Sequence, residues 1–186
     1  LLQTLKSIEA SQQRDNIEII IVDDGSREDH RLEDVASSSS LNIKIIYLDP
    51  KDKWYINPCV VFNKGFKEAQ GDIIIIQNPE CYHLGDVLSC ATNVTDQQYF
   101  TFHAYSLTNE MNEQLTHLDP AHINSLGGSL MVSDLPFEIV NVGAHIEGQP
   151  GYYNHNTLRP NGYHFCSAIT RKNLEARVKA LEDQLS

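Results

Sequence analysis

The sequence predicts an α/β domain in which a mostly parallel, Rossmann-like sheet is flanked by helices. Two apolar, β-branched runs, residues 17–22 and 73–76, are typical of strands buried on both faces. Each run ends in polar residues, 23–26 (Asp-Asp-Gly-Ser) and 78–80 (Asn-Pro-Glu). Open α/β sheets bind ligands at the carboxyl ends of their strands, so the two polar ends together predict a site. Ordinary solvated turns are the alternative interpretation of either end alone.

Helices and strands alternate through the first ninety residues. In order, the spacing of apolar residues predicts a helix over 1–8, a strand over 17–22, a helix over 30–36, a strand over 42–48, a helix over 58–69, a strand over 73–77 and a helix over 85–91. In the helix predicted over 58–69, the residues expected to face the core are Val61, Phe62, Phe66 and Ala69. Gly71 is expected to end this helix with a positive φ. The helix predicted over 1–8 has no strand before it, which predicts that the N-terminus of the domain is truncated or unusual.

The second half of the chain is less regular. It predicts a strand over 98–105, a helix over 108–118, a loop over 118–128, a strand over 138–143, a polar and aromatic loop over 148–165 and a helix over 171–185. In the last helix, Leu174, Val178, Leu181 and Leu185 recur at steps of three and four. We expect this helix to dock on the body rather than form a dimeric coiled coil, because two heptads are few.

Composition narrows the class of protein. With 186 residues, one domain over 1–186 is expected, and the net charge of -11 argues against nucleic acid or an anionic membrane as the main partner. The four cysteines lack metal spacing and predict reduced, mostly buried thiols of a cytoplasmic protein. No apolar run approaches the roughly 18 residues of a membrane span, so no transmembrane segment is expected.

The polar strand ends suggest a chemistry. An Asp at the tip of a strand accepts hydrogen bonds from planar N–H groups, such as the imide of uracil. Asn78 and Glu80 offer two oxygen ligands on one side of an extended chain, a half-shell for Mg²⁺ or Mn²⁺. Such a cation brings a diphosphate to an acidic protein. A site that binds a base, a diphosphate and a metal ion together is typical of a protein that binds a nucleotide sugar.

The order and spacing of residues 22–26, 62–72 and 78–80 resemble family 2 glycosyltransferases, which have the GT-A fold. The resemblance covers residues 1–92, which would form the nucleotide-sugar-binding half. Residues 162–171 look like the family's acceptor-side strand, so 93–170 would form the acceptor half and 171–186 a C-terminal helix.

The resemblance also implies roles for individual residues. The implied nucleotide-binding set is Asp23, Asp24, Gly25, Ser26 and Asn63. Asn63 matches the Asn of an Arg-Asn-x-Gly motif, in which Phe62 replaces the Arg. Asn78 and Glu80 match the two acids of the Asp-x-Asp metal motif, with His164 as an additional ligand.

The remaining candidates lie on loops. Trp54, His155 and Arg159 belong to the predicted donor and acceptor loops, where His155 is also an alternative to His164 beside the diphosphate. The family's catalytic base, a carboxylate beyond the acceptor strand, has no counterpart here. Asp134, Glu138 and Glu147 are possible substitutes, none of which the spacing selects, so the base is unassigned.

We therefore expect an inverting, metal-assisted glycosyltransferase that moves a sugar from a nucleotide sugar, such as a UDP-sugar, to an unknown acceptor. The alternative is a catalytically inactive GT-A-like module that binds nucleotide or carbohydrate or has a structural role. A nucleotidyltransferase is disfavoured because no Gly- and Lys/Arg-rich phosphate loop opens the chain.

Overall fold

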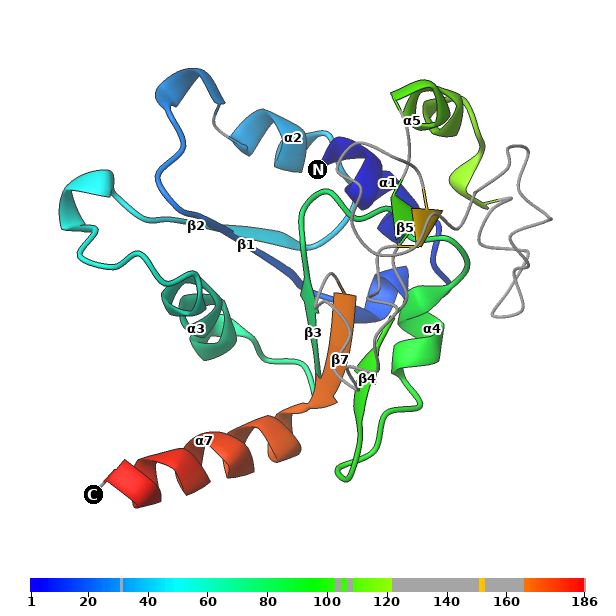
Figure 1. The fold of residues 1–186 in the computed structure, drawn as a ribbon. Coiled ribbons are helices and arrows are strands. Elements are labelled where there is room, and N and C mark those ends of the chain that lie inside the picture. The colour runs from blue at the N-terminus through cyan, green and yellow to red at the C-terminus, as the bar shows by residue number, and fades with distance from the viewer. Residues whose placement is uncertain (31, 103–104, 107–108, 122–150, 153–165, 186) are drawn as a thin grey trace.

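The computed structural model describes residues 1–30, 32–102, 105–106, 109–121, 151–152 and 166–185, and they form an α/β fold (Figure 1). The α-helices are α1 (Leu2–Glu9), α2 (Glu33–Ser37), α3 (Cys59–Glu68), α4 (Val87–Ala91), α5 (Asn109–Thr116) and α7 (Arg171–Leu185). The strands are β1 (Ile19–Asp23), β2 (Ile43–Tyr47), β3 (Ile73–Gln77), β4 (Tyr99–Thr101), β5 (Tyr105–Ser106), β6 (Gly151–Tyr152) and β7 (Cys166–Thr170). Short 3-10 turns cover Arg14–Asn16, Glu28–His30 and Pro50–Asp52.

Strands β1 and β2 pair in parallel, from Ile19 opposite Ile43 to Asp23 opposite Tyr47. Helix α3 follows β2 and packs on β1 before the chain continues into β3. The contact is close at Gly65, where an added Cβ would lie 3.3 Å from a methyl group of Val22. A parallel pair with flanking helices confirms the predicted α/β class.

Strand β7 lies between β3 and β4 and runs antiparallel to both. Its pairing with β3 joins Ile73 to Thr170, two residues far apart in the sequence. A strand was expected in this region, but its place in the sheet depends on a long-range pairing that local sequence does not specify.

The buried core lies where α1, α4 and the strands meet. Leu5 and Ile8 of α1 cluster with Leu41 and Leu88, each at most 9% exposed. In β3 only Ile74 is buried, while the other three isoleucines are half-buried. The prediction of burial on both faces is therefore wrong for most of this strand.

The end of α3 also differs from expectation. The helix ends at Glu68, and Ala69 leaves it in an extended conformation, with φ of -66° and ψ of 140°. Among the described residues the positive-φ glycines are Gly25 and Gly85, so Gly71 has no such role. Phe62 is 37% exposed, so its predicted place in the core-facing stripe is wrong.

All four cysteines are free thiols, but they are not mostly buried. Cys59 and Cys90 are exposed, Cys81 is half-buried and Cys166 is buried. Cys59 is the first residue of α3, and Cys90 lies in α4.

Helix α7 is anchored at its first residue and then leads away from the sheets (Figure 1). The Arg171 guanidinium donates to the carbonyls of Gly71 at 3.0 Å and Ala69 at 2.6 Å. Residues 175–180 are exposed, and Val178 is 47% exposed, so the expectation of a docked helix is wrong for these residues. In the part of the chain that the structure describes, we find no helix with the length and apolarity needed to cross a membrane.

Candidate functional site

The end of β1 is built around a buried carboxylate. Asp23 is 4% exposed, and its Oδ1 accepts a 2.7 Å hydrogen bond from the backbone N–H of Ser26. Gly25 sits inside this turn at φ 87°, where an added Cβ would come within 2.7 Å of the Pro50 ring. Asp23, Gly25 and Ser26 therefore shape the turn that presents Asp24.

Asp24 points outward and is engaged on both oxygens. Its Oδ2 pairs with Lys53 Nζ at 2.6 Å and its Oδ1 accepts from the Tyr55 hydroxyl at 2.6 Å. The Lys53 ammonium and then the Tyr55 hydroxyl lower the pKa of this carboxyl, and the carboxylate raises the pKa of Tyr55 to about 12. Asp24 is thus an ionised acceptor at neutral pH, held by two donors from one loop.

That loop, residues 49–57, carries the most exposed large hydrophobic side chains of the described chain. Trp54 is 82% exposed and Ile56 is 99% exposed. The Trp54 ring meets the Tyr55 ring edge to face, with centroids 5.7 Å apart, and Lys53 lies 5.4 Å from the Tyr55 centroid. An accessible indole therefore lies in the sequence between Lys53 and Tyr55, the two residues whose side chains hold Asp24.

At the end of β3, the predicted pair of metal ligands lies on one turn. Asn78 Nδ2 donates to Glu80 Oε1 at 3.1 Å, and the backbone N–H of Cys81 closes the turn onto the Asn78 carbonyl at 3.2 Å. The donor set, one amide and one carboxylate, suits Mg²⁺ or Mn²⁺ in kind. Within the described ranges, no three His, Cys, Asp or Glu side chains cluster in a way that could hold a metal.

A buried polar network supports this turn from beneath. Thr4 Oγ1 of α1 donates to the Pro79 carbonyl at 2.6 Å, and the His83 N–H donates to Ser7 Oγ at 3.1 Å. The His83 ring is 2.6 Å from Gln77 Oε1, the last residue of β3. Burial lowers the pKa of His83 to about 4, against a smaller opposite effect of Asp86, so the ring is neutral at pH 7.

Sequence reasoning missed this network. His83 is 3% exposed, Thr4 is 5% and Ser7 is 1%. A signal did exist: Thr4 and Ser7 alternate with Leu5 and Ile8 on the apolar side of the first helix, where small polar residues need partners. His83 carried no such signal, because its burial depends on how the loop after β3 turns back under α1.

The remaining predicted residues are not all brought to the two strand ends. Asn63 is exposed on α3, roughly 160° around the helix from Gly65, which faces β1. His155, Arg159 and His164 lie outside the described residues, as do the candidate bases Asp134, Glu138 and Glu147. Their predicted roles stay predictions.

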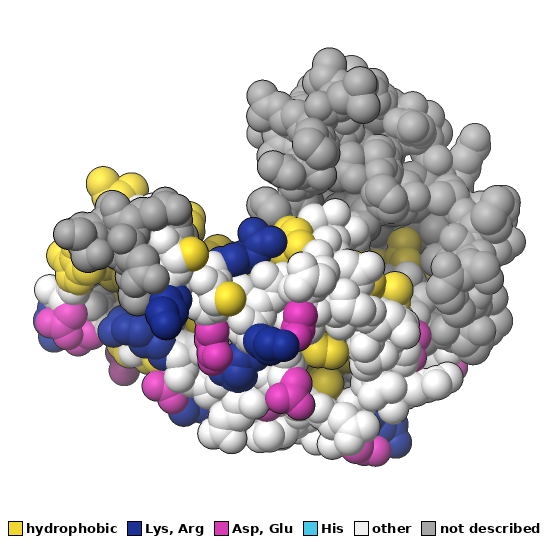
Figure 2. Space-filling model, turned by 90° about the horizontal axis from the view of Figure 1, so that it is seen from below, with side chains coloured by type: hydrophobic (Ala, Val, Ile, Leu, Met, Phe, Trp, Pro, Cys, Tyr) yellow, Lys and Arg dark blue, Asp and Glu magenta, His cyan; other side chains and the backbone are white. Residues whose placement is uncertain are grey.

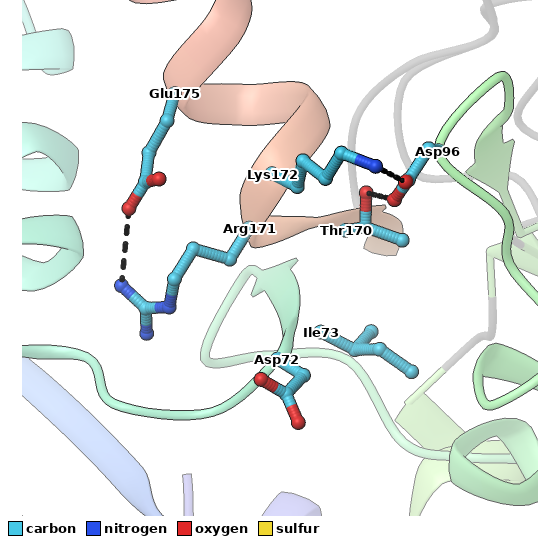
Figure 3. A pocket seen from close by; sticks show the side chains of 7 residues that line it. All are labelled: Asp72, Ile73, Asp96, Thr170, Arg171, Lys172 and Glu175. Carbon is cyan, nitrogen blue, oxygen red and sulfur yellow. Dashed lines mark hydrogen bonds and ion pairs between the residues drawn. The ribbon is translucent and has the colours of Figure 1, made fainter.

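A hollow of about 310 Å³, lined mainly by residues with charged side chains, lies at the opposite end of β3, at the base of α7 (Figure 3). Lys172 pairs with Asp96 at 2.5 Å, and Asp96 also accepts from Thr170 at 2.8 Å. Arg171 lies 4.0 Å from Glu175. Because these charges are paired with one another, the hollow serves to anchor α7, and about 20 Å of strand separates it from Asn78.

On the face shown in Figure 2, positive and negative side chains are intermingled. Dark blue Lys and Arg side chains alternate there with magenta Asp and Glu side chains. This mixed face agrees with the net charge of -11 in offering no basic patch for a nucleic-acid backbone.

Comparison with protein families matches residues 1–114 to the family described as glycosyl transferase family 2. The matched stretch contains both strand ends and the loop that holds Asp24. No curated protein and no solved structure matches the chain.

Proposed function

This chain belongs to glycosyl transferase family 2, and on that premise we propose that it binds a UDP-sugar at the ends of β1 and β3 and transfers the sugar, with inversion, to an acceptor not yet identified. Membership of the family supports a glycosyltransferase-like function and implies a nucleotide-sugar donor and an acceptor. The assignment of donor, metal and stereochemistry is the proposal. So are a donor half over 1–92, an acceptor half over 93–170, and a cytoplasmic location.

The observation that carries the proposal is the state of Asp24. Its carboxylate stands at a strand end and makes short hydrogen bonds to two donors, Lys53 and Tyr55, that come from a single exposed loop. An incoming uracil imide N–H is also a hydrogen-bond donor, and it would take the place of one of them. The loop would then move, and the Trp54 indole would supply a flat apolar surface for the base.

The turn at 78–80 would hold the cation. Asn78 Oδ1 and Glu80 would supply two oxygen ligands, and the donor diphosphate would supply others, as is common for Mg²⁺ and Mn²⁺. When bound, the cation would offset the charge of the diphosphate in a protein of net charge -11. The Thr4 hydroxyl keeps the turn in place through the Pro79 carbonyl.

Titration of the intrinsic fluorescence tests donor binding, because Trp54 is the only tryptophan in the chain. UDP with Mn²⁺ should change the emission, and Asp24→Asn should weaken binding by about tenfold, the effect of one charged hydrogen bond. Asp15→Asn is the matched control, since Asp15 is exposed and precedes the amino end of β1, whereas Asp24 follows its carboxyl end. Absence of both a fluorescence change and calorimetric heat with UDP would refute the proposal.

A second candidate function is a family member that binds nucleotide or carbohydrate without turnover. It is favoured by one observation: both oxygens of Asp24 and one donor of Asn78 are already satisfied by the protein's own side chains. Release of UDP from UDP-sugars in the presence of Mn²⁺ separates the two functions. Binding with turnover supports the transferase, and binding without turnover supports the non-catalytic module.

A further inference from the structure

The two side chains that donate to Asp24 come from parts of the loop that are anchored differently. The backbone N–H of Lys53 donates to the Pro50 carbonyl at 3.3 Å. Pro50 packs against Gly25, so closely that a Cβ added to this glycine would lie 2.7 Å from the proline ring. In the part of the chain that the structure describes, residues 54–56 make no backbone hydrogen bond. The backbone therefore fixes Lys53 beside the β1 turn, whereas the segment that bears the tyrosine has no such anchor.

The two hydrogen bonds to the carboxylate also differ in charge. Lys53 Nζ and Asp24 Oδ2 form an ion pair at 2.6 Å, whereas the Tyr55 hydroxyl that donates to Oδ1 is neutral. The lysine bond thus includes an attraction between opposite charges that the phenol bond lacks. The neighbours of the phenol, Trp54 and Ile56, are 82% and 99% exposed, so few contacts are lost when this segment moves. A ligand that competes for the carboxylate therefore displaces Tyr55 more readily than Lys53.

Once the phenol leaves, Asp24 and Lys53 present a hydrogen-bond acceptor beside a donor. An ammonium has three N–H donors, and the bond to Oδ2 uses one of them. The Lys53 side chain is 38% exposed, so its other donors can reach a ligand. In uracil the imide N–H lies between two carbonyls, so a base that donates to Oδ1 brings one carbonyl oxygen next to this ammonium. The pair therefore matches two adjacent groups on the imide edge of the base.

From this we propose that the Tyr55 hydroxyl is a removable stand-in for the base, and that Lys53 stays on Asp24 and donates to a uracil carbonyl. The free protein is then partly self-inhibited, because the nucleotide has to displace the phenol. The inference rests on the proposed function, since it takes a uridine nucleotide as the ligand of the β1 end. It adds one residue that binds the base, Lys53, and one that opposes binding, Tyr55.

Calorimetric titration with UDP and Mn²⁺ separates the two roles. Tyr55→Phe removes the competing hydroxyl and should bind UDP about fivefold more tightly than the native chain. Lys53→Met removes the donor while keeping an unbranched side chain, and it should bind UDP about tenfold more weakly. Lys51→Met is the matched control, because Lys51 lies on the same loop with its side chain 89% exposed. It should change the affinity by less than about twofold.

A double variant and a modified nucleotide test whether the phenol acts through Asp24. In an Asp24→Asn background, Tyr55→Phe should change the affinity for UDP by less than about twofold, because the competition is for the carboxylate. UDP that is methylated at the imide nitrogen cannot donate to Oδ1. For this nucleotide, Tyr55→Phe should likewise give no gain in affinity.

The outcomes distinguish this inference from the proposed function. If neither the native chain nor Tyr55→Phe binds UDP, the proposed function itself fails. If UDP binds, but Tyr55→Phe does not bind it more tightly or Lys53→Met binds it as well as the native chain, this inference alone is overturned. A gain from Tyr55→Phe that persists in the Asp24→Asn background also overturns it, because the hydroxyl would then act at another place.

Discussion

The two polar strand ends are built in opposite ways. At the end of β1, Asp24 is exposed and is held by side chains of a surface loop, Lys53 and Tyr55. At the end of β3, the turn bearing Asn78 and Glu80 is supported by hydrogen bonds from buried residues of α1 and from the buried His83. Exposed ion pairs contribute little to stability, whereas buried polar networks are costly to break. The first end is therefore suited to exchanging partners and the second to staying fixed.

Acid should affect the β3 end most, because His83 is buried as a neutral ring. Its pKa of about 4 in the folded protein lies below the usual 6.5, so the unfolded chain binds more protons between these values. The contribution of the neutral His83 ring to the free energy of unfolding is complete above pH 6.5 and is lost as the pH falls toward 4. We expect His83 to account for a fall of about 2 kcal/mol in the free energy of unfolding between pH 7 and pH 5.

Urea unfolding of the native chain and of His83→Gln at both pH values measures this effect. The variant should start less stable and lose less between pH 7 and pH 5. Equal losses in the two proteins would show that His83 is not the titrating group.

Gly25→Ala tests whether the β1 turn is as rigid as the contacts of Asp23 suggest. The positive φ and the 2.7 Å approach to Pro50 should lower the free energy of unfolding by about 1.5 kcal/mol. Gly71→Ala is the matched control, since its φ is not positive and its nearest contact is 3.4 Å away, and it should change stability by less than about 0.5 kcal/mol. Similar losses for both variants would remove the special role of Gly25.

Thr4→Val sharpens the account of the β3 end by removing one hydroxyl at nearly constant volume. Loss of the bond to the Pro79 carbonyl should cost about 1 kcal/mol in chemical denaturation. Binding of UDP with Mn²⁺, measured by Trp54 fluorescence, should weaken at the same time, because the turn that carries Asn78 and Glu80 loses its support. If the variant is less stable but binds UDP with Mn²⁺ as well as the native chain, the hydrogen bonds beneath the turn at 78–80 do not support ligand binding.

Of these variants, Asp24→Asn should change the free energy of unfolding least, but it should clearly change the pKa of one neighbouring group. Without the carboxylate charge, the pKa of the Tyr55 phenol should fall from about 12 toward its ordinary 10. The difference in ultraviolet absorbance between the two proteins during an alkaline titration reports this shift. The denaturation midpoint should stay unchanged, and a loss as large as that of Thr4→Val would break the contrast between the two ends.

The sequence predicted the parts of this molecule that local patterns determine. The spacing of apolar residues located the helices 59–68 and 171–185 and the strands 43–47 and 73–77 within one or two residues. It also identified Asp24, Asn78 and Glu80 as side chains at strand ends. These features follow from periodicity and from the chemistry of turns.

Long-range contacts explain what was missed. The loop that holds Asp24 is fixed by Lys53 and Tyr55, each about thirty positions along the chain, and no local pattern announces such a pair. Thr4 likewise reaches the Pro79 carbonyl, and His83 reaches Ser7, only because α1 folds over the end of β3. The exposure of α7 was missed for a related reason: an amphipathic helix shows which face is apolar but not what covers it.

The central place of β7 has a consequence for how the protein is made. During translation, β3 and β4 leave the ribosome long before β7. Until β7 has emerged, the edges of β3 and β4 that pair with it in the folded protein lack this backbone partner. Chaperone occupancy of the nascent chain should therefore persist until Thr170 has emerged. A fragment trimmed to the family match at residue 114 would lack the segment that completes its own sheet.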